Sequence, residues 1–235
     1  MTNDERYTVQ ERLPEINKEG QLKINRAHVA IVGCGGLGCF AALSLTGLGI
    51  GRLTLIDGDT VELRNLQRQL LFKESDVGRF KSSVAKETLE HRNSTIKVIA
   101  HNNFLAPENL KNYFEGVDVI VDGTDNYSSR LLIDSYCSYH KIPLVFAGVK
   151  GFEGQVSVFN YKGGKSLKEV FRQTENIFRA ENCSDSGVMP YVVAATANFQ
   201  VNEVVKIILG SKEVLQGKLL YFDMMKLVFR TLLLK

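Results

Sequence analysis

A glycine-rich turn between two apolar segments constrains this chain more than any other feature. The apolar segment His28–Val32 predicts a buried strand, and GCGGLG at residues 33–38 follows it and matches the pattern G-x-G-x-x-G. Such a turn lets backbone N–H groups approach a phosphate at the positive end of the next helix. A second strand is predicted over Arg52–Ile56, and Asp57 follows it where a ribose-binding acid belongs. The glycines expected in the phosphate cradle are Gly33, Gly35 and Gly36.

Charged residues of both signs follow the second strand, and they favour a triphosphate over a dinucleotide. The two phosphates of a dinucleotide are already held by the helix end. A triphosphate carries about four negative charges together with magnesium, so it requires cations and carboxylates in the same place. The residues that provide both signs are Asp57, Asp59, Arg64, Arg68, Arg79 and Lys81.

Four motifs in register carry a resemblance to a known family. GCGGLG, DGDTVELRNLQRQ, DVGRFK and DGTDN, in this order and spacing, resemble the ThiF/MoeB/HesA adenylating enzymes, which are related to the ubiquitin-activating enzymes. The resemblance extends from about Arg6 to Gly210, and it is strongest to ThiF. It implies ATP-dependent adenylation of the C-terminal glycine of a small ubiquitin-like sulfur carrier that ends in Gly-Gly, with release of pyrophosphate.

The resemblance also implies a role for each matching residue. Asp57 is expected to bind the ribose hydroxyls, and Asp125 to hold Mg²⁺ and orient the triphosphate. The expected phosphate contacts are Asn65, Arg68 and Lys81. Further contacts with the nucleotide are expected from Arg64, Leu66, Gln67 and Asn126. Asp59 is expected either to help hold the metal or to stabilise its loop. The residues expected to be catalytic are Arg68, Lys81, Asp125 and Cys183.

Three of these residues also have ordinary structural interpretations. Lys81 falls in the first turn of a predicted helix, where the helix dipole disfavours a cation, unless an anion lies opposite. The alternative is a solvated surface lysine. Asp122 and Asp125 follow the predicted strand Val117–Val121, so both are expected to point at the same crevice as Asp57. Either Asp125 or Asn126 is suited to cap the next helix.

Length and pattern predict one α/β domain in 235 residues. The expected fold is a Rossmann-like, mostly parallel sheet with helices on both faces, extended by antiparallel strands after residue 150, because alternating apolar and polar residues begin at Gly154. Residues 28–150 are expected to bind the nucleotide, and residues 151–235 to bind the carrier and form a dimer. A helix over Val188–Leu209, broken early by Pro190, and a C-terminal β-hairpin are also predicted.

Composition argues against several other classes of protein. The net charge of +3 favours neither nucleic acid nor a membrane surface as a partner. The first residues lack the basic-then-apolar pattern of a signal peptide, and no apolar run is expected to approach the roughly 20 residues that a membrane span needs. The cysteines are scattered, which fits reduced thiols in a cytoplasmic protein. Those expected in the core are Cys34, Cys39 and Cys137.

Cys183 and zinc are judged against the family pattern. Cysteines of ThiF-like proteins in the position of Cys183 can bond covalently to the sulfur carrier, and a polar loop before a helix favours a reactive thiol. A spare loop cysteine is the alternative.

Most family members hold structural Zn²⁺ with two C-x-x-C pairs, but here residues 162–165 read KGGK and the second pair is missing, so no zinc is expected. A cysteine desulfurase or another sulfur donor is an expected partner.

The N-terminal segment departs from the family. The resemblance implies an arginine that reaches the ATP site of the partner subunit in a homodimer, but Val9 stands in its place. Arg6 and Arg12 are candidate substitutes.

Alternative functions remain open from the sequence. One alternative is the same adenylation reaction with the molybdopterin synthase small subunit as the carrier. Another is a nicotinamide-dependent oxidoreductase, although that function leaves Arg68, Lys81 and Asp125 unexplained. A non-catalytic binding partner would fit Val9 and the missing zinc ligands. A tRNA-modifying dehydratase related to this family lacks support from any basic stripe.

Overall fold

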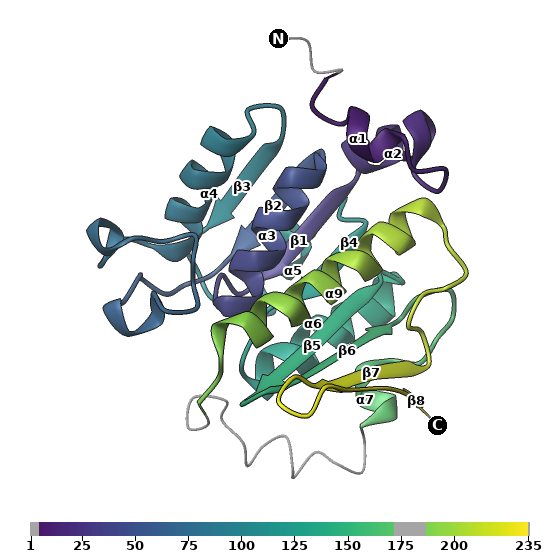
Figure 1. The fold of residues 1–235 in the computed structure, drawn as a ribbon. Helices are drawn as coiled ribbons and strands as arrows, with labels where there is room; N and C mark the ends of the chain where they lie inside the picture. Colours follow the sequence, from purple (N-terminus) through teal and green to yellow (C-terminus); the bar gives the residue numbers. More distant parts are fainter. Residues whose placement is uncertain (1–4, 172–186, 235) are drawn as a thin grey trace.

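The computed structural model describes residues 5–171 and 187–234. Its strands are β1 (His28–Val32), β2 (Arg52–Ile56), β3 (Lys97–His101), β4 (Val119–Asp122), β5 (Leu144–Lys150), β6 (Glu153–Phe159), β7 (Lys218–Asp223) and β8 (Val228–Leu233). Its α-helices are α1 (Thr8–Glu11), α2 (Asn17–Arg26), α3 (Gly36–Leu48), α4 (Lys81–Arg92), α5 (Leu110–Tyr113), α6 (Tyr127–His140), α7 (Leu167–Val170) and α9 (Pro190–Leu209). Figure 1 shows their arrangement.

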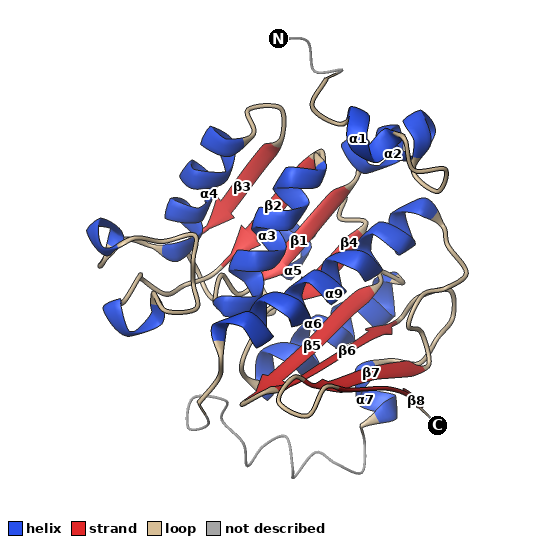
Figure 2. Cartoon of the chain, in the orientation of Figure 1, coloured by secondary structure: helices blue, strands red, loops and turns tan. Residues whose placement is uncertain are grey.

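The strands form one eight-stranded sheet with the order β3-β2-β1-β4-β5-β6-β7-β8. The pairs from β3 to β5 are parallel, whereas β5 to β8 pair antiparallel. The antiparallel strands lie together at one end of the sheet in Figure 2. The predicted fold class is therefore confirmed, including the change of strand direction near residue 150.

Helices cover both faces of the sheet. Val29 and Ile31 of β1 belong to a core that includes residues of α3, α4 and α9, whereas Ala30 and Val32 pack with residues of α6 and α7. All five residues of β1 are buried, as expected for a parallel strand covered on both sides. Figure 1 shows α3 and α9 side by side on one face, with α6 behind the sheet.

The site is positioned by a reversal of strand order. The chain runs from β1 outward to β2 and β3, and then returns to place β4 on the other side of β1. Ligands of such sheets bind at this switch point, beyond the carboxyl ends of the strands. The loops that leave β1, β2 and β4 therefore meet at one rim of the sheet.

Two predictions from the sequence need correction. Pro190 does not break the last helix but begins it, because the first turn needs no proline N–H. The expectation that no apolar run approaches the length of a membrane span is also wrong: α9 is the one helix in the described part of the chain with sufficient length and apolar character. It packs as a core helix against α3 and the sheet.

Candidate functional site

The glycine turn after β1 has room for backbone only. Gly33 has a φ of +91°, and a Cβ there would lie 2.7 Å from the carbonyl oxygen of Gly123. A Cβ on Gly38 would lie 1.9 Å from the oxygen of Gly33. Gly35 is the N-cap of α3, and no side chain caps this helix. The first N–H groups of α3 are therefore left to an anion, and the helix dipole favours one.

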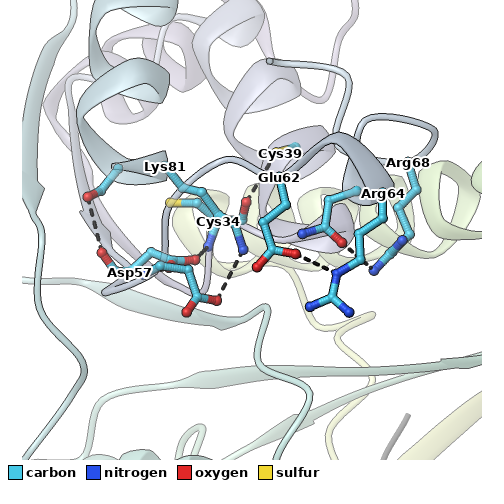
Figure 3. Close-up of polar contacts among 10 residues, drawn as sticks. Cys34, Cys39, Asp57, Glu62, Arg64, Arg68 and Lys81 are labelled. Atoms are coloured by element: carbon cyan, nitrogen blue, oxygen red, sulfur yellow. Dashed lines mark hydrogen bonds and ion pairs between the residues drawn. The ribbon is translucent and has the colours of Figure 1, made fainter. Parts of the chain in front are cut away.

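Asp57 lies directly under this turn. Its Oδ2 accepts a hydrogen bond of 2.6 Å from the Cys34 N–H, and its Oδ1 accepts one of 2.8 Å from the Asp59 N–H (Figure 3). Burial raises the pKa of the Asp57 carboxyl, and these hydrogen bonds and the nearby Lys81 oppose that rise. The Asp57 carboxylate thus connects the glycine turn to the end of β2. Asp57 itself lies at the rim of the sheet where the strand ends meet.

Lys81 is buried, so it is not the solvated surface lysine of the ordinary interpretation. Its side chain is 6% exposed, and Nζ lies 3.1 Å from Oδ2 of Asp59, whose side chain is 55% exposed. The Lys81 N–H also donates to the Asp59 carbonyl oxygen at 3.0 Å. A buried ammonium whose partner faces solvent can contact an incoming anion. These two contacts connect Asp59 to the start of α4, which is compatible with its expected role in stabilising the loop.

The segment between β2 and α4 forms a loop closed at its base. Thr60 and Phe80 form an antiparallel bridge at this base. Across the same base, the Val61 N–H donates to the Arg79 carbonyl oxygen, and the Gly78 N–H donates to the Val61 carbonyl oxygen. This closure holds residues 62–77 as an arm over the glycine turn. The arm carries the predicted phosphate contacts Asn65 and Arg68.

Within the arm, the predicted contacts differ in their setting. Arg68 donates from a guanidinium nitrogen to Oδ1 of Asn65 at 3.2 Å, and its Cγ lies 3.5 Å from the position of a Cβ on Gly36. Arg64 is 82% exposed and paired with Glu62 (Figure 3). Gln67 is exposed, and Leu66 packs against the core. Arg68 therefore lies against the glycine turn, whereas the Arg64 guanidinium reaches solvent.

Arg79 is not a free cation for phosphate. Its guanidinium lies 3.1 Å from Asp76 and 2.7 Å from Glu87, so it ties the arm to α4. The sequence shows the charge of Arg79 but not these two partners, which only the folded arm brings together.

Gln69 is a polar residue of the arm that the sequence reasoning missed. Its side chain is buried, with 3% of the residue exposed, and Oε1 has no hydrogen-bond partner among the described residues. Nε2 lies 3.9 Å from the position of a Cβ on Gly35. A buried unpaired carbonyl oxygen costs about 1–3 kcal/mol. No sequence signal distinguishes Gln69 from Gln67, since only the fold shows which of the two is buried.

The loop after β4 adjoins the glycine turn, because the Gly123 N–H donates to the Val32 carbonyl oxygen at 2.8 Å. Asp122 does not point freely into the crevice: its Oδ2 lies 3.0 Å from Nε of Arg130, and both side chains are buried. Asn126 caps α6 by accepting from the Ser129 N–H at 2.9 Å. Asp125 is therefore not the cap, and it is exposed beside the turn.

The described cysteines are packing residues. Cys34, Cys39 and Cys137 are buried thiols, and burial raises the pKa of Cys39 to about 12 and the pKa of the other two well above the ordinary value. Neutral, buried thiols are poor nucleophiles. Cys183 lies outside the described residues.

The segment after Tyr161, where zinc-binding relatives carry their first cysteine pair, is held here by hydrogen bonds. Ser166 and Glu169 form a capping box at the start of α7. The buried Asp134 accepts from the Leu167 N–H at 2.9 Å and from the Asn160 side chain at 2.8 Å. No three metal-ligating side chains converge within residues 5–171 and 187–234.

The chemistry of this rim suits a nucleoside triphosphate. It combines an uncapped helix N-terminus, the buried cation Lys81, Arg68 against Gly36 and the exposed Asp125. Phosphates accept hydrogen bonds from the helix N–H groups, Lys81 and Arg68. Mg²⁺ needs only one or two carboxylates, such as that of Asp125, beside phosphate oxygens. Val9, in place of the expected arginine, is 74% exposed on α1. The fold and this rim define a Rossmann-like nucleotide-binding domain.

The chain belongs to the ThiF family, whose model matches residues 7–235. It is 42% identical to the Anopheles gambiae "Adenylyltransferase and sulfurtransferase MOCS3" over 237 aligned residues, which cover 100% of this chain and 54% of that protein. The Sus scrofa protein of the same name is 38% identical over 98% of this chain and 50% of its own length. The chain thus spans about half the length of these relatives.

Solved structures share the fold. Selenomethionine PaaA superposes with a TM-score of 0.83 at 27% identity, covering 100% of this chain and 75% of that one. Escherichia coli MccB, solved with ATP, superposes with a TM-score of 0.79 at 24% identity, covering 95% of this chain and 72% of MccB. The MccB similarity supports the fold alone.

Proposed function

We propose that this domain catalyses the ATP-dependent adenylation of the C-terminal glycine of a ubiquitin-like sulfur carrier protein, with release of pyrophosphate. The observation that carries the proposal is the pair of cations at the glycine turn: Lys81 is buried against the exposed Asp59, and Arg68 packs on Gly36. A nicotinamide enzyme has no need for these cations. Family membership and relatives named adenylyltransferases support the same reaction.

In this reaction ATP supplies the adenylyl group, and the carrier's terminal carboxylate attacks the α-phosphorus. The residues of this chain position the reactants and neutralise charge. Asp57 binds the ribose hydroxyls, while Asn65, Arg68 and Lys81 hold phosphate oxygens. Asp125 is proposed to hold Mg²⁺ with the triphosphate. Because Asn126 already caps α6, the Asp125 carboxylate is available for this role.

The identity of the carrier remains a choice between two proposals. Cys183 favours the sulfur carrier of thiamine biosynthesis, because ThiF-like proteins use a cysteine in that position. The similarity to MOCS3 proteins favours the molybdopterin synthase small subunit. Both carriers end in Gly-Gly, so the chemistry at the rim is the same.

Four further proposals complete this function. The Cys183 thiolate attacks the carbonyl carbon of the adenylated glycine and displaces AMP, so that a thioester to the carrier forms, and a cysteine desulfurase or another donor supplies the sulfur in the cytoplasm. The domain acts as a homodimer. Arg6 or Arg12 replaces the arginine absent at Val9; Arg6 donates to the Arg92 carbonyl oxygen at 3.2 Å from an exposed position and is free to leave it.

Pyrophosphate exchange into ATP tests the function. We expect exchange that depends on a Gly-Gly-ended carrier, and a comparison of the two carriers identifies the pathway. Cys183→Ala is expected to keep the exchange and to lose only sulfur transfer. Carrier binding without exchange would instead identify a non-catalytic partner, and tight NADH binding without ATP binding would identify an oxidoreductase.

A further inference from the structure

Gln69 has a fixed backbone and an unanchored side chain. Its N–H donates to the Asn65 carbonyl oxygen at 3.1 Å, and its carbonyl oxygen accepts from the Phe72 N–H at 3.1 Å. These bonds hold the residue in the arm directly after Arg68. Its Oε1, by contrast, is buried and has no partner among the described residues.

A second buried glutamine shows what a structural amide looks like in this fold. Gln200 of α9 also has an unpaired Oε1, but its Nε2 donates to the carbonyl oxygens of Asp122 at 2.9 Å and Val145 at 3.1 Å. Those two bonds tie α9 to the sheet. The Gln69 amide has no such anchor in the described part of the chain, so packing rather than hydrogen bonding holds it.

The position of the Gln69 amide relates it to the phosphate cradle. Nε2 lies 3.9 Å from where a Cβ would stand on Gly35, which is the N-cap residue of α3. The missing side chain of Gly35 leaves space between this amide and the uncapped helix end. An N–H donor at this place faces the same anion as the α3 backbone and the neighbouring Arg68.

We propose that the Gln69 side-chain amide contacts the nucleotide, donating from Nε2 to a phosphate oxygen of the bound nucleoside triphosphate. The contact rests on the proposed function, since it takes ATP as the ligand of the glycine turn. A neutral amide adds a directed donor without adding charge beside Lys81 and Arg68. It thereby restricts the orientation of a phosphate that the two cations attract.

Gln69→Leu tests this contact, with Ser75→Leu as the control at an exposed position of the same arm. ATP binding is measured by calorimetry without any carrier, and unfolding by thermal melting. We expect Gln69→Leu to weaken ATP binding about ten-fold to a hundred-fold, the loss of one hydrogen bond to a charged group. Its melting temperature should equal or exceed that of the wild type, because an unpaired buried oxygen is removed. Ser75→Leu should change neither quantity.

Kinetics and a second variant make the test robust. If the contact forms equally in the ground state and the transition state, Gln69→Leu raises KM for ATP and leaves kcat of pyrophosphate exchange unchanged. Gln69→Glu keeps the shape of the side chain but places a carboxylate beside the phosphates, so it should weaken ATP binding at least as much, even if the leucine variant misfolds.

Two results would overturn the inference in distinguishable ways. Folded Gln69→Leu or Gln69→Glu that binds ATP as tightly as the wild type would show that the amide is only a packing residue, and would leave the proposed function intact. Failure of the wild-type chain itself to bind ATP would remove both the inference and the proposed function.

Discussion

The ends of β2 and β4 each carry an ion pair between an aspartate and a basic residue, but the two pairs differ in burial. An aspartate near each strand end is paired with a basic residue from the following α-helix. Asp59, which lies after β2, pairs with Lys81 of α4, and Asp122, the last residue of β4, pairs with Arg130 of α6. At β4 both partners are buried, with side-chain exposures of 1% and 9%. At β2 the cation is buried, but 55% of its partner's side chain faces solvent.

This difference separates a structural ion pair from one available for binding. Arg130 also donates to the carbonyl oxygens of Thr124 and Ala147 and lies over the Phe146 ring, so all of its interactions are internal. Lys81 has a single charged partner at the surface and lies near Asp57 under the glycine turn. An anion at the turn can therefore reach Lys81 without disrupting the core. The predictions below test this contrast.

The largest expected effect is on stability at β4. Arg130→Met leaves the buried Asp122 without its cation, which should lower the free energy of unfolding by about 3–5 kcal/mol. Denaturant titration measures this. The double variant Asp122→Asn with Arg130→Met should recover much of the loss, because no buried charge remains. A loss below about 1 kcal/mol for the single variant would mean that the pair behaves as a surface ion pair.

Lys81→Met should have the next largest effect, and it should act on binding. Removal of the buried cation is expected to weaken ATP binding about a hundred-fold, because a charge-assisted contact is lost, while Asp59 remains solvated and the fold survives. Lys86→Met is the control on the same helix, since Lys86 pairs with Glu90 away from the turn. Equal effects of the two variants on ATP binding would refute the special role of Lys81.

Arg68 and Arg64 sharpen the contrast within the arm. Arg68→Ala is expected to lower the rate of pyrophosphate exchange about ten-fold to a hundred-fold, because Arg68 lies on the glycine turn. Arg64→Ala should lower it less than about three-fold, since an exposed ion pair contributes little. The reverse order of effects would place the phosphates over the outer part of the arm.

The smallest expected effect concerns the pH dependence of Asp57. Burial raises the pKa of this carboxyl, so it takes up a proton at a higher pH than an exposed aspartate does. Its charge therefore disfavours the folded state at neutral pH, and this penalty is relieved as the pH falls through the raised pKa. Ribose binding needs the ionised form, so ATP affinity should fall over the same range.

Calorimetry between about pH 7 and about pH 4 checks this dependence on pH. Asp57→Asn should bind ATP weakly with little variation across that range. Wild-type affinity that stays constant to the acid limit would show that Asp57 does not act as an ionised group in binding.

The sequence predicted those parts of the fold that depend on local pattern. The limits of β1 and β2 follow from apolar segments bounded by glycine and aspartate, and the observed strands match them. The change to antiparallel pairing followed from alternation beginning near Gly154. A proline at the first helical position was misread as a break, because sequence alone does not fix where a helix starts.

The less predictable features depend on contacts between distant residues. The pairing of Arg79 with Glu87 and the bridge between Thr60 and Phe80 depend on how the arm folds back, and no local pattern shows this. Asn126 rather than Asp125 is the cap because α6 begins at Tyr127. A start one residue earlier would make Asp125 the cap. The burial of Gln69 is likewise a consequence of tertiary packing.

A crystal structure with a non-hydrolysable ATP analogue and Mg²⁺ tests the central claim most directly. The account predicts phosphate oxygens at the start of α3, in contact with Lys81 and Arg68, and the metal beside Asp125. An analogue bound elsewhere on the molecule, or phosphates distant from both cations, would contradict it.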